Sequence, residues 1–331
     1  MLPGKMQENK VLRSVIIGCG NVAGGYDDVE GGTVNTHAGA YKLAPETQLI
    51  AVSDIDVSVA KLFCTKWNVN NYYSDLNEML DKENPDIVSI CTPDETHITI
   101  LKQVHKWPNV QAVWCEKPLA TDVEEAKEIV RIFKQTGILL AINYTRRWNK
   151  GFQAIGRMIR NGKLGKIQNA VLYYTKGICH NGSHAINLFK DWFGSLKSCQ
   201  VFDGLIDFSL KDPTFNARAV FGETPVFLLG FDEREYTIFD MDILGTKGRI
   251  QITREGIKCF SVCSDSEYDG YKMLSSNDNI QNEETISAIQ VALDNIVSAV
   301  KEGESLICDG EDALKTLLIC DKMIKFAKGK I

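Results

Sequence analysis

A glycine-rich turn near the start of the chain has the spacing of a nucleotide-binding turn. Gly18, Gly20 and Ala23 form a G-x-G-x-x-A pattern directly after the apolar segment "VLRSVII". The first glycine permits a tight turn, the second lets a pyrophosphate approach the backbone, and the third small residue lets helix and strand pack closely. A helix that starts here offers N–H groups and a positive dipole end to phosphate. The pattern predicts dinucleotide binding, with an ordinary turn as the alternative, by the residues Gly18, Cys19, Gly20, Asn21, Val22 and Ala23.

An acidic residue, Asp54, ends the next apolar segment in "LIAVSDID". A carboxylate at this place accepts hydrogen bonds from the ribose hydroxyls of NAD and repels the 2′-phosphate of NADP. No cation follows before Lys61, so NAD is favoured over NADP as the cofactor. The alternative for Asp54 is a helix N-cap, although Asp56 is the better candidate for that role.

The stretch between the glycine turn and Asp54 is unusually long. Asp54 lies more than thirty positions after Gly20, where about 20 is typical. The excess is "GGYDDVEGGTVNT", rich in glycine and acids. We expect a helix to begin at Asn21, to end near Gly24-Gly25, and a helix to resume near "HAGAYKLA". The segment from Gly25 to Thr36 is then either a flap near the phosphates or a surface loop.

Two histidines with an adjacent cysteine have a spacing that metal sites use. His180 and His184 lie four positions apart, and Cys179 precedes His180. On a helix this would place two ligands on one face. However, Gly182 lies between them, and the segment has no acid between the histidines as in H-E-x-x-H. We therefore predict no metal site here.

Two kinds of pattern divide the chain. As far as residue 144, apolar segments alternate with helical patterns, which predicts a parallel sheet with helices on both faces. After about residue 150 several strand-like segments follow one another, which favours an antiparallel sheet, and two amphipathic helices close the chain. The predicted fold class is α/β. A Rossmann domain with a doubly wound parallel sheet spans residues 11–144, and an α+β domain with a large open sheet, for substrate binding and oligomerisation, spans residues 145–331.

Composition excludes several function classes. The 331 residues carry a net charge of −6, so a nucleic-acid-binding surface is not expected. We see no signal peptide and no stretch of membrane-spanning length, and we expect a cytoplasmic protein without a membrane partner. Ten cysteines without a C-x-x-C pair are expected to be reduced thiols rather than zinc ligands.

Motifs along almost the whole chain resemble the Gfo/Idh/MocA oxidoreductases. The segments are "GCGNVA", "THAGAYK", "VSDID", "CTPDETH", "CEKPLA", "NYTRRW", "GSHAINLF" and "DILGTKGRIQI", in the order and spacing of that family. The resemblance implies NAD(P)-dependent oxidation or reduction of a sugar, a cyclitol or a nucleotide-linked sugar. It also implies a homodimer or homotetramer that assembles through the open sheet of the second domain.

The same resemblance implies roles for residues that follow the first-domain strands. Lys117 of the E-K-P triplet is similar to the family's catalytic lysine beside the nicotinamide, and Glu116 and Pro118 would hold its backbone, often with a cis peptide before the proline. His97 is either a cofactor neighbour or a residue of a helix's first turn. The predicted cofactor-side residues are Thr92, Pro93, His97, Glu116, Lys117, Asn143, Tyr144 and Arg147.

His184 is similar to the family's catalytic histidine, but its surroundings depart from the family pattern. His180 and Asn187 stand where aspartates are usual. We expect His184 to act as the base and Lys117 to stabilise the alkoxide, with Lys117 as the alternative base. His180 would hydrogen-bond substrate or His184.

Two other functions stay open: a non-catalytic NAD-binding regulator and an NAD-dependent glycosidase. For the substrate, the resemblance favours a nucleotide-linked or amino sugar over free inositol. A diphosphate would then need local cations, and the candidates are Arg146, Arg147 and Lys176.

Overall fold

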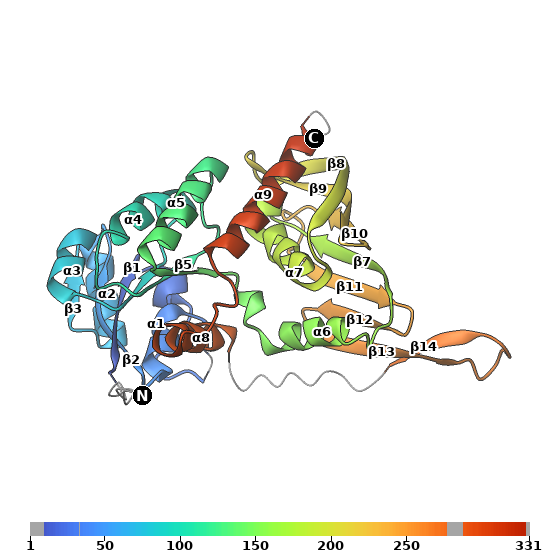
Figure 1. Ribbon diagram of the computed structural model, residues 1–331, viewed down its shortest axis with the longest axis horizontal. Helices are drawn as coiled ribbons and strands as arrows, with labels where there is room; N and C mark the ends of the chain where they lie inside the picture. Colours follow the sequence, from blue (N-terminus) through green and yellow to red (C-terminus); the bar gives the residue numbers. More distant parts are fainter. Residues whose placement is uncertain (1–9, 33, 277–286, 329–331) are drawn as a thin grey trace, which may run out of the picture. The chain divides into compact units, whose positions relative to one another are not determined.

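The computed structural model describes residues 10–32, 34–276 and 287–328, and it divides the chain into two units. Unit 1 comprises Met1–Trp148 and Ile286–Leu314, and unit 2 comprises Asn149–Thr285 and Lys315–Ile331 (Figure 1). This division differs from the predicted domains 11–144 and 145–331, because a segment near the end of the chain joins unit 1.

Unit 1 is built on a six-stranded parallel sheet with the strand order β3-β2-β1-β4-β5-β6. Its central strands are apolar and buried, as expected for a sheet covered on both faces. The order reverses between β1 and β4, which is the point where such sheets bind ligands. The strands are β1 (Leu12–Ile17), β2 (Thr47–Ser53), β3 (Asn71–Tyr73), β4 (Ile87–Ile90), β5 (Ala112–Glu116) and β6 (Leu139–Asn143).

Most helices of unit 1 begin at a side-chain cap, which fixes where each one leaves its loop. Thr36, Asp56, Asp75 and Asp122 each accept a hydrogen bond from a backbone N–H of the first turn. The short turns are η1 (Asn21–Gly25), η2 (Asp94–Thr96) and η3 (Thr145–Arg147). The α-helices are α1 (His37–Leu43), α2 (Val57–Trp67), α3 (Leu76–Glu83), α4 (His97–Val104), α5 (Val123–Thr136) and α8 (Ala288–Glu302).

Helix α8 explains why the domain boundary was predicted differently. It packs on α1 and β6 of unit 1, and it lies beside α1 in Figure 1. Its apolar face, including Leu293 and Ile296, is fully buried, and the Asn295 side chain accepts a hydrogen bond from the indole of Trp148 at 3.2 Å. An amphipathic pattern predicts that a face is buried, but it does not identify the surface against which the face packs.

Unit 2 contains an eight-stranded sheet with the order β14-β13-β12-β11-β7-β10-β9-β8. Its pairs are antiparallel except β7 with β10, which confirms the predicted, mostly antiparallel sheet. The strands are β7 (Ile167–Tyr174), β8 (Leu196–Ser209), β9 (Asp212–Phe221), β10 (Thr224–Gly230), β11 (Phe239–Gly245), β12 (Gly248–Thr253), β13 (Gly256–Ser264) and β14 (Lys272–Ser276).

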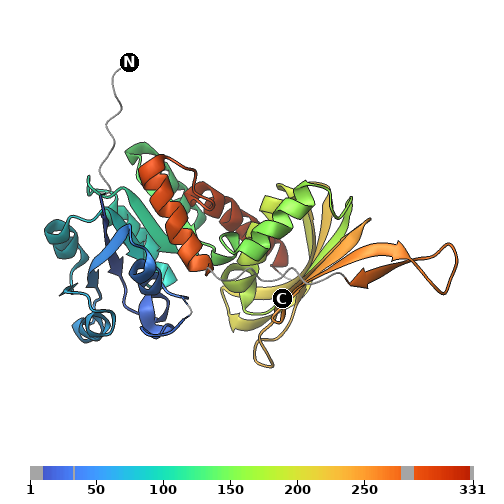
Figure 2. The same cartoon turned by 90° about the horizontal axis from the view of Figure 1, so that it is seen from below.

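One face of this sheet forms the core of unit 2. The turn η4 (Gly177–Gly182) and the helices α6 (Lys150–Arg160), α7 (Ser183–Phe193) and α9 (Gly310–Ala327) supply its cover. Figure 2 shows the strands of unit 2 as a fan, with α6 beside it. The shared core includes Leu172, Tyr174, Phe189, Phe215 and Met323. Residues that alternate with them, such as Val171 and Phe227, are half-exposed on the other face.

None of the helices in the described ranges has the length and hydropathy that a bilayer crossing needs. All ten cysteines are free thiols.

Candidate active site

The glycine turn lies at the carboxyl end of β1 and has the geometry that its sequence predicts. Gly18 has φ of 87°, and a Cβ there would come within 2.8 Å of the Thr92 side chain. Its N–H donates to the Ser53 carbonyl at 2.7 Å. At Gly20, by contrast, a Cβ would meet nothing within 4 Å. The backbone is therefore approachable at Gly20, as a pyrophosphate requires.

Asp54 holds the same turn from the end of β2. Its carboxylate accepts from the Cys19 N–H at 2.8 Å and from the Asp56 N–H at 2.9 Å. Asp56 is the N-cap of α2 and accepts from the Ser58 N–H at 2.9 Å. The N-cap of α2 is therefore Asp56, and the ribose-binding role of Asp54 stays a prediction.

The helix after the glycine turn is a single wide turn, η1, and the structure explains why it stops. The N–H groups of Gly24 and Gly25 both bond to the Gly20 carbonyl at 3.2 Å. A side chain at Gly24 would overlap Trp67 and Phe63 of α2. The chain then leaves as a loop and the helix resumes at His37, close to the predicted "HAGAYKLA".

A buried carboxylate closes this loop. Asp27 accepts from the backbone N–H groups of Asn35 and Thr36, both at 2.9 Å, and from the Thr36 hydroxyl at 2.7 Å. The Thr36 hydroxyl in turn caps α1 by accepting from the Gly39 N–H at 3.1 Å. The inserted segment therefore has a fixed base, and its predicted role as a flap is untested.

His97 joins the turn after β4 to the turn after β5. It is the first residue of α4 and is fully buried. Its Nδ1 lies 2.7 Å from the Pro118 carbonyl and its Nε2 lies 2.9 Å from the Thr92 carbonyl. His97 therefore lies in the first turn of a helix, and its role as a cofactor neighbour stays a prediction. Through these contacts it positions Thr92 and the turn that carries Lys117, whose peptide bond to Pro118 is cis.

Glu116, the last residue of β5, is held by two neighbouring segments. Its Oε1 lies 3.0 Å from Nε2 of His37 and accepts from Nδ2 of Asn143 at 2.5 Å. Burial by itself raises the pKa of Glu116, but His37, Asn143 and Lys117 outweigh it and lower that pKa overall. Glu116 is therefore a charged carboxylate beside Lys117.

The positive charge of Lys117 also affects the pKa of Asp94 in η2. Burial raises the pKa of Asp94, and the positive charge of Lys117 opposes that rise. Pro93 precedes Asp94 and is the N-cap residue of η2. Lys117, Thr92, Pro93 and Glu116 thus gather at the carboxyl ends of β4 and β5.

Arg147 has two partners within unit 1. Its guanidinium donates to Asp312 at 2.9 Å and to the Ile307 carbonyl at 3.0 Å. This pairing ties η3 to the segment after α8, and the predicted contact of Arg147 with the cofactor stays a prediction.

In unit 2, the histidine segment is helical and is capped by an acid that lies far along the chain. Asp212 accepts from the N–H groups of Cys179 and His180, both at 2.7 Å. Gly177 has φ of 71°, and a side chain there would overlap Asp212. The carboxylate therefore fixes the start of η4, which leads directly into α7 and His184.

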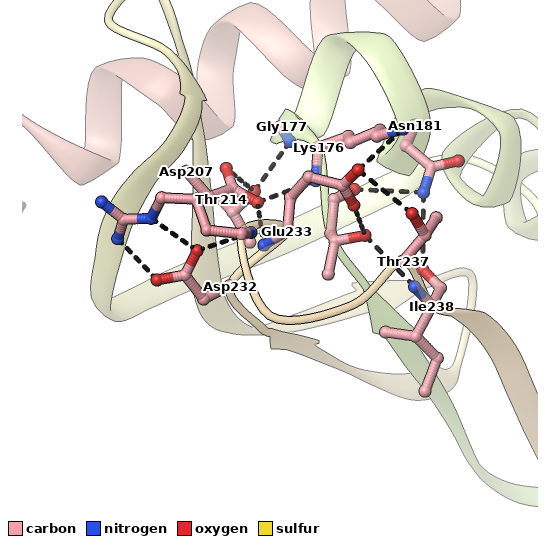
Figure 3. Close-up of polar contacts among 11 residues, drawn as sticks. Lys176, Gly177, Asn181, Asp207, Thr214, Asp232, Glu233, Thr237 and Ile238 are labelled. Atoms are coloured by element: carbon pink, nitrogen blue, oxygen red, sulfur yellow. Dashed lines mark hydrogen bonds and ion pairs between the residues drawn. The ribbon is translucent and has the colours of Figure 1, made fainter.

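Figure 3 shows the polar contacts that precede this helix. The Lys176 ammonium pairs with Glu233 at 2.8 Å, and the Lys176 N–H donates to Asp207 at 2.9 Å. Thr175 and Thr237 also donate to Glu233, each at 3.1 Å. The loop before β11 is thereby fastened to the turn that carries His180.

The two histidines face different surroundings. The His180 ring packs on Phe208 with 4.7 Å between ring centroids, and the His184 ring meets the Phe239 ring edge-on at 6.4 Å. Asn187, in the place of a family aspartate, is buried and donates to the Thr316 hydroxyl of α9 at 2.8 Å. Within the described ranges, no cluster of three or more metal-binding side chains occurs.

Sequence reasoning missed several residues that shape these sites. The motif "THAGAYK" assigns no role to its His37, and no motif indicates Asp27, Phe208 or Asp212. The spacing between Asp27 and Thr36 carries no recognised motif. Asp212 and Phe208 come from the end of a strand hairpin, so only the sheet register places them beside His180.

The fold and the glycine turn together define unit 1 as a Rossmann-type nucleotide-binding domain. Residues 12–144 match the family profile GFO_IDH_MocA, described as "Oxidoreductase family, NAD-binding Rossmann fold". This domain is therefore similar to the NAD-binding domain of the Gfo/Idh/MocA oxidoreductases, the family that the sequence motifs resemble.

Curated relatives match just under half of the chain. D-glucoside 3-dehydrogenase of Escherichia coli (strain K12) is 32% identical over 159 residues, which are 47% of this chain and 41% of that protein. Myo-inositol 2-dehydrogenase of Thermotoga maritima is 26% identical over 155 residues, 47% of this chain and 42% of that protein. The chain thus spans about two fifths of the length of these relatives.

A solved structure shows the same fold over both units. The WlbA dehydrogenase of Bordetella pertussis, in complex with NADH and UDP-GlcNAcA, superposes with a TM-score of 0.77, and the match covers 97% of each chain at 17% identity.

Proposed function

We propose that this protein is an NAD-dependent oxidoreductase that transfers a hydride between a secondary alcohol carbon of a sugar and the nicotinamide. The observation that carries the proposal is a continuous set of contacts in unit 1. Gly18 of the phosphate turn meets Thr92, the Thr92 carbonyl faces His97, and His97 faces the carbonyl of Pro118 beside Lys117. One edge of the sheet thus carries both the glycine turn and Lys117.

The residues present fit a bound dinucleotide. The open backbone at Gly20 leaves room for the pyrophosphate, and Asp54 offers a carboxylate at the end of β2. NAD, when bound, supplies the hydride acceptor. The chain's own residues do the acid–base work: His184 takes the hydroxyl proton, and the Lys117 ammonium donates a hydrogen bond to the substrate oxygen. The alternative assigns the base to Lys117.

The proposed substrate class rests on the names of the relatives and on the ion pairs that this chain's cations form. Curated relatives are named for a glucoside and for myo-inositol, and the WlbA structure holds a nucleotide-linked sugar. In this chain, two of the three cations proposed to bind a diphosphate already pair with carboxylates: Lys176 with Glu233 and Arg147 with Asp312. These pairs favour an uncharged sugar or cyclitol over the nucleotide-linked sugar that the sequence analysis preferred.

The test is a substrate panel followed at 340 nm with NAD and NADP. It contains free hexoses, glucosides, inositols and UDP-sugars. We expect NADH to accumulate with at least one uncharged sugar or cyclitol. Turnover with UDP-sugars alone would instead support the nucleotide-linked sugar that the sequence analysis favours. Release of an aglycone without net NADH would indicate a glycosidase, and cofactor binding without turnover on any member of the panel would indicate a regulator.

We also propose self-association through the open face of the unit 2 sheet. The half-exposed apolar side chains on its central strands, Val171, Phe227 and Leu229 among them, need a cover that a second copy can supply. The ten free thiols suit a reducing compartment, and we place the protein in the cytoplasm.

A further inference from the structure

A buried histidine that the proposed mechanism does not use lies next to the Lys117 turn. His37 is fully buried, and its ring packs on Trp114 with 3.8 Å between ring centroids. Its Nδ1 lies 3.0 Å from the Ser89 hydroxyl, and its Nε2 lies 3.0 Å from the Glu116 carboxylate. A ring bonded at both nitrogens and packed against a third group has a single orientation.

One contact of this network has a fixed direction. The Glu116 carboxylate accepts, so Nε2 of His37 donates to it. The other ring nitrogen, Nδ1, contacts the Ser89 hydroxyl, which can donate or accept. The Tyr41 hydroxyl lies 2.8 Å from that of Ser89 and extends the series. Every group in the series from Tyr41 to Glu116 thus has a hydrogen-bond partner.

We propose that His37 is a positioning residue for Lys117 and acts through Glu116, by holding that carboxylate in one place beside the lysine. The inference rests on the proposed function, in which Lys117 contacts the substrate oxygen. His37 directly follows Thr36, which Asp27 holds at the base of the inserted loop. The insertion therefore helps to place the donor that orders the Lys117 turn.

Removal of His37 has a definite electrostatic consequence. Glu116 would keep Asn143 as a donor but lose one hydrogen bond in a buried site, and Lys117 is a cation close enough to influence it. The carboxylate would therefore turn toward the Lys117 ammonium and stabilise its charged form. The other titratable groups around this turn are Asp94, His97, Cys91 and Cys115, and all of them stay in place in the variants below.

The experiment measures the reactivity of the Lys117 amine in the whole protein, without any substrate. Trace acetylation with acetic anhydride between pH 7 and pH 10 is quantified by mass spectrometry of the Lys117 peptide. His37→Phe keeps a ring against Trp114 and removes the donor. We expect labelling at fixed pH to fall about threefold, because the Glu116 carboxylate then stabilises the charged form of the amine. His37→Gln, which can still donate to Glu116, should label within a factor of two of the wild type.

A double variant tests whether His37 acts through Glu116. In the Glu116→Gln background the charge is gone, so His37→Phe should leave Lys117 labelling unchanged. Tyr73→Phe is the matched control, because Tyr73 donates at 2.7 Å to Glu83, another buried carboxylate of unit 1. It should lower thermal stability without changing Lys117 labelling.

An unchanged rate in His37→Phe, or an equal effect of His37→Phe in both backgrounds, would overturn the proposal. If His37→Phe does not fold, Ser89→Ala removes the partner of Nδ1 and is judged by the same two criteria. Failure of the proposed function would appear separately, as an absence of turnover in the 340 nm panel, because the labelling assay contains no sugar.

Discussion

The Asp54 carboxylate has two roles. It holds the backbone of the glycine turn, and by our proposal it selects the cofactor. Asp54→Asn keeps an oxygen that can accept from the Cys19 N–H but removes the negative charge. We therefore expect the turn to persist and the preference for NAD over NADP to fall by about tenfold, since repulsion of the 2′-phosphate is lost. The measurement is the dissociation constant of each cofactor.

A matched control is Asp56→Ala at the N-cap of α2. It should reduce the free energy of unfolding by about 1 kcal/mol and leave the ratio of the two dissociation constants unchanged. An unaltered ratio in Asp54→Asn would remove Asp54 from cofactor selection.

His97 predicts a pH dependence of stability. Burial alone lowers the pKa of His97, but Cys115 and the carbonyls of Pro118 and Thr92 raise it to about 10, from an ordinary value of 6.5. Because the folded state holds this proton more tightly, its stabilisation is fully present below pH 6.5 and is lost as the pH rises toward about 10.

The free energy of unfolding of the wild type should therefore fall more steeply over this range than that of His97→Gln, as urea titrations at several pH values would show. His105→Gln, at the other end of α4, should behave like the wild type. Parallel curves for the wild type and His97→Gln would show that His97 is neutral in the folded protein.

At the scale of elements, the inserted loop depends on Asp27. Asp27→Ala leaves the Asn35 and Thr36 donors without their partner, and an unsatisfied buried donor costs about 1–3 kcal/mol. We expect faster proteolysis within residues 26–36 and a lower melting temperature. Asp28→Ala is the control, because that side chain is exposed. Equal cleavage rates in both variants would show that Asp27 does not hold the loop.

Local sequence patterns predict several features of the elements in unit 1. The strand–turn–helix alternation of unit 1 and the break near Gly24 depend on local patterns, and both were predicted. The wide turn η1 was not, because it depends on Phe63 and Trp67 of α2, which pack where a side chain at Gly24 would be. Likewise Asp212 lies on β9, and its contact with His180 follows from the pairing of β8 with β9 rather than from any motif.

For the whole molecule, the residue patterns predicted the fold class and the place of Lys117, Glu116 and Thr92 at strand ends. They did not predict the partners of buried polar groups, because His37 and Glu116 lie 79 positions apart. Nor did they assign α8, since its apolar face fits any apolar surface. Local periodicity thus determines which elements form, while packing determines which of them share a unit.

Assembly is a property of the whole molecule that follows from the unit 2 sheet. On its open face Phe227 of β10 lies between Arg218 of β9 and Val171 of β7, and Val171 pairs with Asp242 of β11. This apolar centre with charged flanks predicts a homodimer or a dimer of dimers. Phe227→Arg should shift the mass toward the monomer in sedimentation experiments at micromolar concentration.

Leu210→Arg, at a highly exposed position on the β8–β9 turn, should leave that mass unchanged. A wild-type protein that sediments as a monomer under the same conditions would refute assembly through this face.

The central claim is that Lys117 and His184 serve one hydride transfer to NAD. The most direct test is steady-state NADH formation, followed at 340 nm with the best sugar from the panel, in the wild type, Lys117→Ala and His184→Ala. We predict that each variant loses roughly 100-fold or more in kcat, the scale of a positioned acid–base group, while the dissociation constant for NAD changes less than about threefold. Near-wild-type kcat in both variants, with NAD binding intact, would contradict the account.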